Sequence, residues 1–520
     1  MPLTLTVPTP DQVENLTVET HPKNLQKRLD SLPLSDLSEV SRTLCDEIGA
    51  LNRQKVAMDT RLKLLDLYRV VILKLLPALE EQFVTARLPL PEKPRQMAEL
   101  AHQLQTELAN GYKIILLDYQ NKRIKLGKGK VALAAAQRSI SVLGRILAIH
   151  YQIYAPTPAG IWSEIHQIFR FAMEQKIADE PVADVSGKGS IGLIYKQALL
   201  LALSDPYQLN PGEVRKIQEY LALFGDLAQL RPLMQTNDPV GLFLVQTDSD
   251  SPPREIPQNL DEASYLNGIL LYTRELAHAL RHHANSLEAG ESPKNLRLPD
   301  AARETGYHDL LRRLLKHWLA IPKRAFRRTR HIADTEVCTS LPAVHHFLGW
   351  HDVDDSTDLS FVQPAKKSQF ISGKWLIVNE SAGGLALRGI FKVLPYIRPG
   401  EIIGLKMDGS DKWYVGAVRW VKSDKARHLE IGAQLLAPKA VPAGIKPSIS
   451  GPVEEFQPAL LLPEIPLLQQ PETLITPHGT FGAQRELQLR FGDNTTQTIH
   501  TVKLLEQTAS FDRFEFSRDR

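Results

Sequence analysis

Residues 374–390 read KWLIVNESAGGLALRGI, and this stretch decides the fold class of the C-terminal half of the chain. Two short apolar runs, 374–379 and 384–390, flank a small polar turn, which is typical of neighbouring β-strands. Several short strands separated by Gly, Pro, Asp and Ser predict a small antiparallel barrel or sandwich. The other runs of this kind lie at 401–407, 413–421 and 429–436.

The chain before about residue 322 has the apolar period of helices instead. Residues 94–109 form one such segment, which Asn110-Gly111 is expected to stop, because Asn and Gly commonly end helices. Residues 131–153 and 308–320 have the same pattern. A large all-α N-terminal region is therefore expected.

The fold class expected from these patterns is multi-domain, because a single core rarely grows past about 250–300 residues and the chain has 520. The all-α region is followed by an antiparallel β-barrel and then by a β-rich C-terminal extension. Eight prolines between 438 and 471 predict an extended linker before that extension. The expected parts are a polar lead (1–22), a helical domain (23–320), a barrel with a preceding basic segment (322–437), a Pro-rich linker (438–471) and a β-rich tail (472–520).

The overall charge is nearly balanced, with 62 Lys and Arg against 59 Asp and Glu and a net charge of +3. No global attraction to nucleic acid or to an anionic membrane is expected, so any anion site must be local. The two cysteines, Cys45 and Cys338, fit a reducing compartment and exclude a disulfide framework. We see no signal peptide and expect no transmembrane span, which together predict a cytoplasmic protein.

No pattern recommends an enzyme. The sequence has no GxSxG, no phosphate-binding Walker loop and no paired carboxylates at recognisable spacing. Neither a metal nor a cofactor is expected. His345 and His346 are placed on a strand, where adjacent side chains point to opposite faces and cannot chelate one metal ion.

One segment stands out by its charge. Ten basic residues, counting histidines, and no acidic residue lie between Arg312 and His331. Such a run is most often a solvated helix face. Here it lies where the helical part gives way to the β part, and about fifty residues later the sequence reads Asn379-Glu380-Ser381-Ala382-Gly383-Gly384.

Taken together, these two segments resemble the PilZ family, which is marked by RxxxR before a barrel and (D/N)xSxxG inside it. Arg324 and Arg328 supply the first motif, and Asn379, Ser381 and Gly384 supply the second. Arg327 and Arg330 lie in the same run, so the register of the arginines stays open. The resemblance covers about residues 322–437.

The resemblance implies a receptor for cyclic di-GMP, a bacterial second messenger with two phosphates and two guanines. The arginines fit that ligand because a guanidinium can hold a phosphate or a guanine edge with two hydrogen bonds. Asn379 and Ser381 can satisfy guanine donors and acceptors, and Gly384 allows either a positive φ or a close approach at the turn. The implied ligand-binding residues are Arg324, Arg327, Arg328, Asn379, Ser381 and Gly384, with Arg330 as an additional candidate.

The function expected is therefore a receptor in which cyclic di-GMP orders the basic segment against the barrel. That ordering would change how the helical domain is presented to a protein partner. The alternative is a protein scaffold whose PilZ barrel no longer binds ligand. A nucleic-acid binder using residues 312–331 is disfavoured by the balanced charge and by the lack of interleaved aromatic residues. The sequence does not select an output pathway.

Overall fold

The computed structural model describes most of the chain as two compact units. The first comprises Met1–Ala86 and Leu90–Lys323, and the second Arg87–Pro89 and Arg324–Arg520. The described residues are 2–9, 18–33, 35–122, 127–184, 187–234, 238–257, 259–260, 262–304, 306–320, 329, 332–350, 370–381, 383–390, 397–425, 428–448, 455–464 and 470–518.

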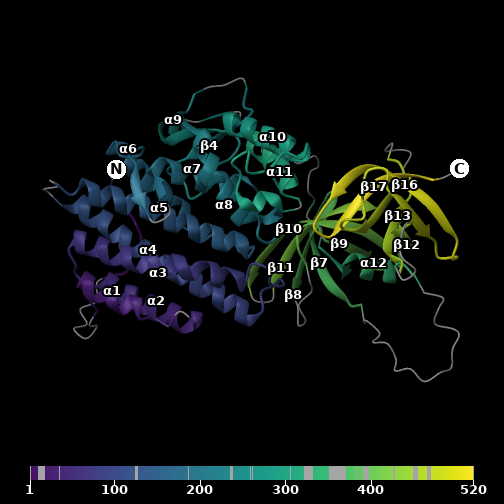
Figure 1. Ribbon diagram of the computed structural model, residues 1–520, viewed down its shortest axis with the longest axis horizontal. Coiled ribbons are helices and arrows are strands. Elements are labelled where there is room, and N and C mark those ends of the chain that lie inside the picture. Colours follow the sequence, from purple (N-terminus) through teal and green to yellow (C-terminus); the bar gives the residue numbers. More distant parts are fainter. Residues whose placement is uncertain are drawn as a thin grey trace. The chain divides into compact units, whose positions relative to one another are not determined.

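The first unit is built mainly of helices, drawn in purple to teal in Figure 1. The helical N-terminal region expected from the sequence is thereby confirmed. Its helices are α1 (Pro22–Asp30), α2 (Leu37–Arg53), α3 (Met58–Glu81), α4 (Glu92–Asn121), α5 (Gly129–Gln152), α6 (Ile161–Glu174), α7 (Ile191–Leu203), α8 (Glu213–Phe224), α9 (Glu262–Asn267), α10 (Arg274–Glu288) and α11 (Tyr307–Leu319). Short 3₁₀ turns are η1 (Pro206–Gln208), η2 (Gly225–Leu227) and η3 (Asp300–Arg303).

Helix α4 packs against α2, α3 and α5 and does not stop where the sequence suggested. It continues through Gly111 to Asn121. A Cβ at Gly111 would lie 2.6 Å from a Leu65 methyl and 2.8 Å from Asn52 Oδ1, so this glycine permits close helix packing. The expected stop at Asn110-Gly111 is wrong, because tertiary packing outweighs the low helix propensity of glycine.

Helix α5 is the central apolar helix of this unit. Among the described residues it is the one helix long and apolar enough to cross a membrane, but 78% of its most apolar window is buried inside the protein. A core helix passes the same test of length and composition. Helix α5 packs against α4, α6 and α7, as a core helix does.

The first unit also holds two small sheets that the sequence did not suggest. Strands β1 (Val182–Asp184) and β2 (Gly187–Gly189) pair as a hairpin before α7. Strands β3 (Gln229–Pro232), β4 (Leu242–Gln246) and β5 (Gly268–Tyr272) form a sheet in the order β3-β5-β4.

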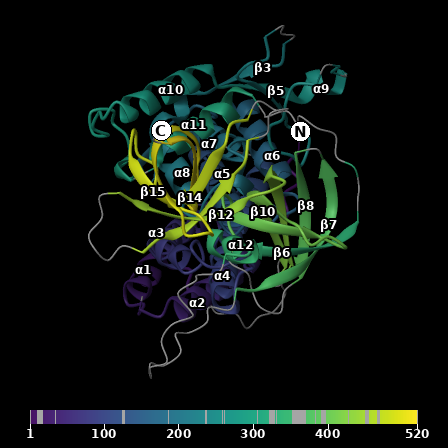
Figure 2. The same cartoon turned by 90° about the vertical axis from the view of Figure 1, so that its right-hand side faces the viewer.

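The second unit contains two closed barrels, drawn in green and yellow in Figure 2. The first has the strand order β10-β11-β8-β7-β6-β9, with every pair antiparallel, as the sequence predicted. Its strands are β6 (Ala333–Thr339), β7 (Ser372–Ser381), β8 (Gly384–Ile390), β9 (Ile402–Met407), β10 (Trp413–Lys425) and β11 (His428–Ala437).

The second barrel confirms a β-rich C-terminal region. It has the strand order β12-β13-β14-β17-β16-β15 and its own core, which includes Leu474, Leu487 and Phe514. Its strands are β12 (Val441–Pro447), β13 (Gln457–Leu462), β14 (Thr473–Pro477), β15 (Glu486–Arg490), β16 (Thr496–Gln507) and β17 (Phe511–Arg518).

The expected linker at 438–471 is wrong where the structure describes it, since β12 and β13 of the second barrel lie there. Three of the eight prolines lie in these strands. They are tolerated because, at each of these positions, the strand has a hydrogen-bonded partner on one side only. Pro442 pairs with β13 outside the stretch that also pairs with β15, and Pro447 pairs with β15 alone. Pro458 pairs with β12 before the pairing with β14 begins.

Helix α12 (Leu341–Phe347) joins the cores of the two barrels. The strand expected at His345-His346 is wrong, because Ser340 caps a helix whose first turn contains Pro342. Val344 packs in a cluster with Ile402 of the first barrel and with residues of the second barrel. The ring of His345 is buried, and its Nε2 lies 2.9 Å from the Ala443 carbonyl oxygen of β12.

Polar contacts at one rim also connect the two barrels. Arg419 of β10 forms an ion pair with Glu506 of β16. The Thr508 hydroxyl donates to the carbonyl of Gly400 at 2.9 Å, and Gly400 has a φ of +81° at a turn where a Cβ would lie 2.9 Å from Thr508. The Ser510 hydroxyl donates to Glu401 at 3.0 Å.

Candidate functional site

The hairpin between β7 and β8 carries the second motif found in the sequence. Ser381 pairs with Gly384 across a two-residue connection, and Asn379 pairs with Ala386. The Ser381 hydroxyl donates to the Gly384 carbonyl at 3.2 Å, which fixes the turn from within. The structure therefore brings Asn379, Ser381 and Gly384 together at one end of the first barrel.

A register shift in β7 decides which way these side chains face. The pairing moves from Ile377 with Leu387 to Asn379 with Ala386, so Val378 is the extra residue of a bulge. Ile377 and Leu387 are buried inside the barrel. Because strand residues alternate in direction and cross-strand partners share a face, Asn379 and Ala386 lie on the outer face.

Gly384 is needed for a close approach of two backbones. A Cβ at this position would lie 2.2 Å from the Ala433 carbonyl oxygen of β11, closer than real Cβ atoms come. The sequence suggested that Gly384 allows either a positive φ or a close approach. Its φ is not positive, so the close approach is the role that the structure shows.

The outer face continues from β8 across β11 to β10, and small residues at its centre lie beside one indole. Gly384, Ala386 and Arg388 of β8 lie opposite Gln434, Gly432 and Glu430 of β11, respectively. Gly432 in turn lies opposite Trp420 of β10. A Cβ at Gly432 would lie 1.9 Å from Trp420 Nε1, so the indole lies over the glycine. This outer face of Gly384, Ala386, Gly432 and Trp420 is called the small-residue face.

Charged groups border the small-residue face on both sides. Arg388 forms an ion pair with Glu430 at 3.0 Å, and Lys422 lies 5.8 Å from the centre of the Trp420 ring. Gln434 accepts a hydrogen bond from Arg419 Nε at 2.7 Å, and Arg419 is the residue that pairs with Glu506 of the second barrel. The face is thus connected to the second barrel through one arginine.

Sequence reasoning did not find Trp420, Gly432 or Gln434. The runs that contain them were predicted as strands. Their position beside the hairpin follows only from the strand order β10-β11-β8-β7 and from the register, which sequence patterns do not give.

The basic segment reaches the hairpin through Thr329. The amide of Thr329 donates to the Glu380 carbonyl at 2.8 Å, and the amide of Glu380 donates back to the Thr329 carbonyl at 3.0 Å. Glu380 lies between Asn379 and Ser381 in the chain, so Thr329 of the basic segment is paired directly with the hairpin that carries the second motif. Arg324, Arg327, Arg328 and Arg330 themselves lie outside the described residues.

Comparison with known proteins agrees with this barrel. Residues 242–353 and 350–442 match the family described as the middle PilZ domain of the cyclic-di-GMP receptor FimW. The chain belongs to a PilZ-containing family. The PilZ match begins well before the barrel, since residue 242 opens β4 in the helical unit.

Two further matches cover the parts around the PilZ domain. Residues 23–235 match the N-terminal domain of the same receptor, and residues 443–518 match its C-terminal beta-barrel domain. A relative named cyclic-di-GMP receptor FimW, from Pseudomonas aeruginosa, is 26% identical over 577 aligned positions. That alignment covers 99% of this chain and 93% of the relative. This PilZ protein is therefore similar to that receptor along nearly its whole length.

Proposed function

We propose that this chain is a cyclic di-GMP receptor whose ligand site is formed by the basic segment and the β7–β8 hairpin together. The observation that carries the proposal is the reciprocal hydrogen bonding of Thr329 and Glu380. Arg328 and Arg330 are the covalent neighbours of Thr329 in the sequence. The similarity to a receptor named for cyclic di-GMP supports the choice of ligand.

The chemistry of the site matches the parts of that ligand. Arginine guanidinium groups bind phosphates and the O6/N7 edge of guanine with paired hydrogen bonds. Asn379 and Ser381 supply an amide and a hydroxyl at the end of β7, within the same hairpin. The partly exposed indole of Trp420, which covers Gly432 on the outer face, provides an aromatic surface on which a base can stack.

We further propose that ligand binding orders the basic segment and changes how the helical unit is presented to a protein partner. Helix α11 ends at Leu319, only a few residues before the arginines, so the two parts share backbone. A ligand can shift such an equilibrium only through different affinities for the two arrangements. Cyclic di-GMP should therefore slow amide exchange in residues 320–332 and in part of the helical unit, while a loose tether would confine protection to the barrels.

The proposed role is non-catalytic, needs no metal or cofactor, and is exercised in the cytoplasm. Cys45 and Cys338 are both unpaired thiols, which supports a reducing compartment. The alternative is a scaffold with a PilZ barrel that has lost ligand binding, and the binding experiment below separates the two.

The experiment is displacement of fluorescently labelled cyclic di-GMP, followed by anisotropy, on the full chain and on single arginine variants. Arg328→Ala should weaken binding by roughly 1.5–3 kcal/mol, about 10- to 140-fold, the scale of lost charge-assisted hydrogen bonds. Arg303→Ala, an exposed arginine of the helical unit, serves as the control and should bind like the parent. Unchanged affinity in Arg324→Ala, Arg327→Ala and Arg328→Ala alike would refute the site.

A further inference from the structure

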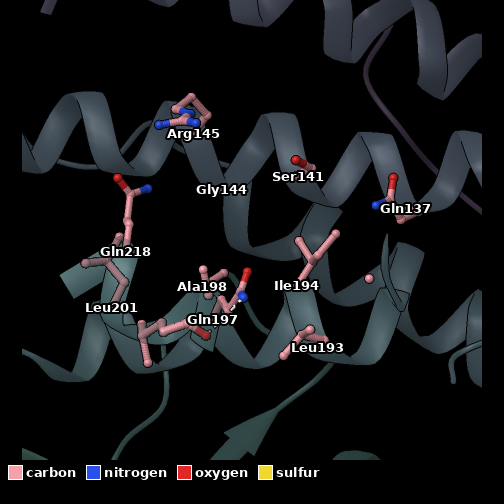
Figure 3. Close-up of a pocket in the computed structure, with 13 residues that line it drawn as sticks. Gln137, Ser141, Gly144, Arg145, Leu193, Ile194, Gln197, Ala198, Leu201 and Gln218 are labelled. Carbon is pink, nitrogen blue, oxygen red and sulfur yellow. Dashed lines mark hydrogen bonds between the residues drawn. The ribbon is translucent and has the colours of Figure 1, made fainter. Parts of the chain in front are cut away.

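A groove in the helical unit runs between α5, α7 and α8 and has a volume of about 280 Å³. Figure 3 shows Arg145 and Gln218 toward one end of it and Gln137 toward the other. Gln137 and Arg145 are eight residues apart on α5, which corresponds to about 12 Å along the helix axis. The groove is therefore elongated.

Small residues of the two main helices face each other along the groove. A Cβ at Gly144 of α5 would lie 3.9 Å from the Ala198 Cβ of α7. Leu193 and Ile194 of α7 supply an apolar wall between the polar ends. The middle of the groove thus favours aliphatic groups, and its ends favour polar ones.

The amide of Gln137 is an independent sign that something binds here. Its side chain is 1% exposed, and Oε1 has no hydrogen-bond partner within the described part of the chain. A buried acceptor without a donor costs about 1–3 kcal/mol, and a ligand N–H would remove that cost when the Gln137 amide turns its oxygen toward the groove. Gln197 is held at the groove by donating from Nε2 to the Leu221 carbonyl at 3.2 Å.

Arg145 gives the groove a single positive charge. It is half-buried, and no hydrogen bond or ion pair engages its guanidinium among the residues that the structure describes. Every other residue lining the groove is uncharged. Charge complementarity therefore points to an occupant with one negative charge at this end.

The lining excludes other classes of occupant. No aromatic residue lines the groove, so a nucleobase would have no stacking surface. No carboxylate, histidine or thiol lines it, so it offers a divalent cation no suitable ligands. Amide groups at both ends suit the N–H and C=O groups of a peptide backbone.

We propose that this groove binds a short extended peptide segment of a partner protein. A length of about 12 Å holds three to four extended residues, each of which rises about 3.3 Å. The segment places an acidic side chain against Arg145, aliphatic side chains against Leu193 and Ile194, and, once the Gln137 amide turns toward the groove, a backbone N–H on its Oε1. This proposal rests on the proposed function in one respect, which is that the helical unit is the part of the chain that binds a protein partner.

The test is selection of a displayed library of random decapeptides on the immobilised full chain, without cyclic di-GMP. Because the ligand is absent from the assay, its outcome does not depend on the PilZ site. Enriched peptides should share one Asp or Glu at a fixed spacing from aliphatic residues. A synthetic copy of the leading peptide is then titrated by fluorescence anisotropy, together with a version in which Asn or Gln replaces the acid.

Matched variants of the chain make the assignment specific. Arg145→Glu should weaken the leading peptide about tenfold or more, as expected for loss of a charge-assisted contact. Arg42→Glu makes the same charge change on the exposed side of α2 and should leave binding unchanged. Gln137→Leu should raise the melting temperature, because it removes the unpaired acceptor, and should still weaken the peptide. A structural role alone would not produce this opposite pair of effects.

Three results would overturn the proposal. The first is that the selection enriches no family of related peptides. The second is that enriched peptides bind Arg145→Glu as tightly as they bind the parent chain. The third is that neutral peptides bind as tightly as acidic ones. Circular dichroism of Arg145→Glu establishes that a loss of binding is not a loss of fold.

Discussion

Replacing Gly384 by Ala adds one methyl group at the place where β8 and β11 approach most closely. That Cβ would lie 2.2 Å from the Ala433 carbonyl oxygen, whereas real Cβ atoms keep at least 3.0 Å, so the strands must separate by about 0.8 Å. The hydrogen bond from the Leu435 amide to the Gly383 carbonyl is already 3.3 Å long and would not survive this.

The size of the effect follows from these two losses. Overpacking a tight site costs about 1–3 kcal/mol and a lost backbone hydrogen bond about 1 kcal/mol, which gives about 2–4 kcal/mol in total. At 1.4 kcal/mol per factor of ten, amide exchange in β8 and β11 should become roughly 30- to 700-fold faster. Cyclic di-GMP affinity should fall with it, because the same hairpin holds Asn379 and Ser381.

Hydrogen exchange with peptide resolution is the suitable assay, since it reports the local stability of β8 and β11 separately from the rest of the chain. The control is Gly373→Ala in β7 of the same barrel, where the nearest atom to an added Cβ is 4.0 Å away. It should change local stability by no more than about 0.5 kcal/mol. If Gly384→Ala exchanges like Gly373→Ala, the close approach is not where we place it.

Three further predictions concern other parts of the chain. Ser381→Ala removes one long hydrogen bond of 3.2 Å at a half-buried position, so it should cost about 0.5–1 kcal/mol of stability. It should reduce the ratio of cyclic di-GMP affinity to cyclic di-AMP affinity more strongly than it reduces stability. An unchanged affinity ratio, measured by calorimetry, argues against a guanine contact. Arg419→Met and Glu506→Gln should be non-additive by about 1 kcal/mol in a double-mutant cycle read from exchange in β16, and strict additivity would mean that this pair does not connect the barrels. Burial lowers the pKa values of His166 and His150 from 6.5 to about 4, so the folded chain binds fewer protons than the unfolded chain between these values. The stability that these two neutral histidines contribute to the helical unit should be complete above pH 6.5 and should be lost as the pH falls toward 4, and a melting temperature that is flat over this range contradicts the assignment.

Local patterns were sufficient to predict the elements that local chemistry determines. The change from helical to strand period, the turn at Asn379–Gly384 and the five strands β7 to β11 follow from residue types that act within a few positions, whereas β6 (Ala333–Thr339) was not predicted. The basic segment and the hairpin were also associated from sequence, although only Thr329 of that segment lies among the described residues.

Features that depend on tertiary contacts could not be predicted in this way. Prolines suggested a linker at 438–471, because composition does not show that a strand can be paired on one side only. Gly111 looked like a helix end, although it serves the packing of α4 against Leu65. The outward direction of Asn379 depends on the bulge at Val378, and the place of Trp420 depends on the strand order.

The most direct test of the central claim is a calorimetric titration of the unmodified full chain with cyclic di-GMP, with GTP as the matched guanine nucleotide. The account predicts saturable binding of cyclic di-GMP, much weaker binding of GTP, and loss of the cyclic di-GMP signal when Arg328→Ala and Ser381→Ala are combined. Absence of saturable binding, or equal binding by the parent and the double variant, would contradict the claim that the basic segment and the hairpin form one ligand site.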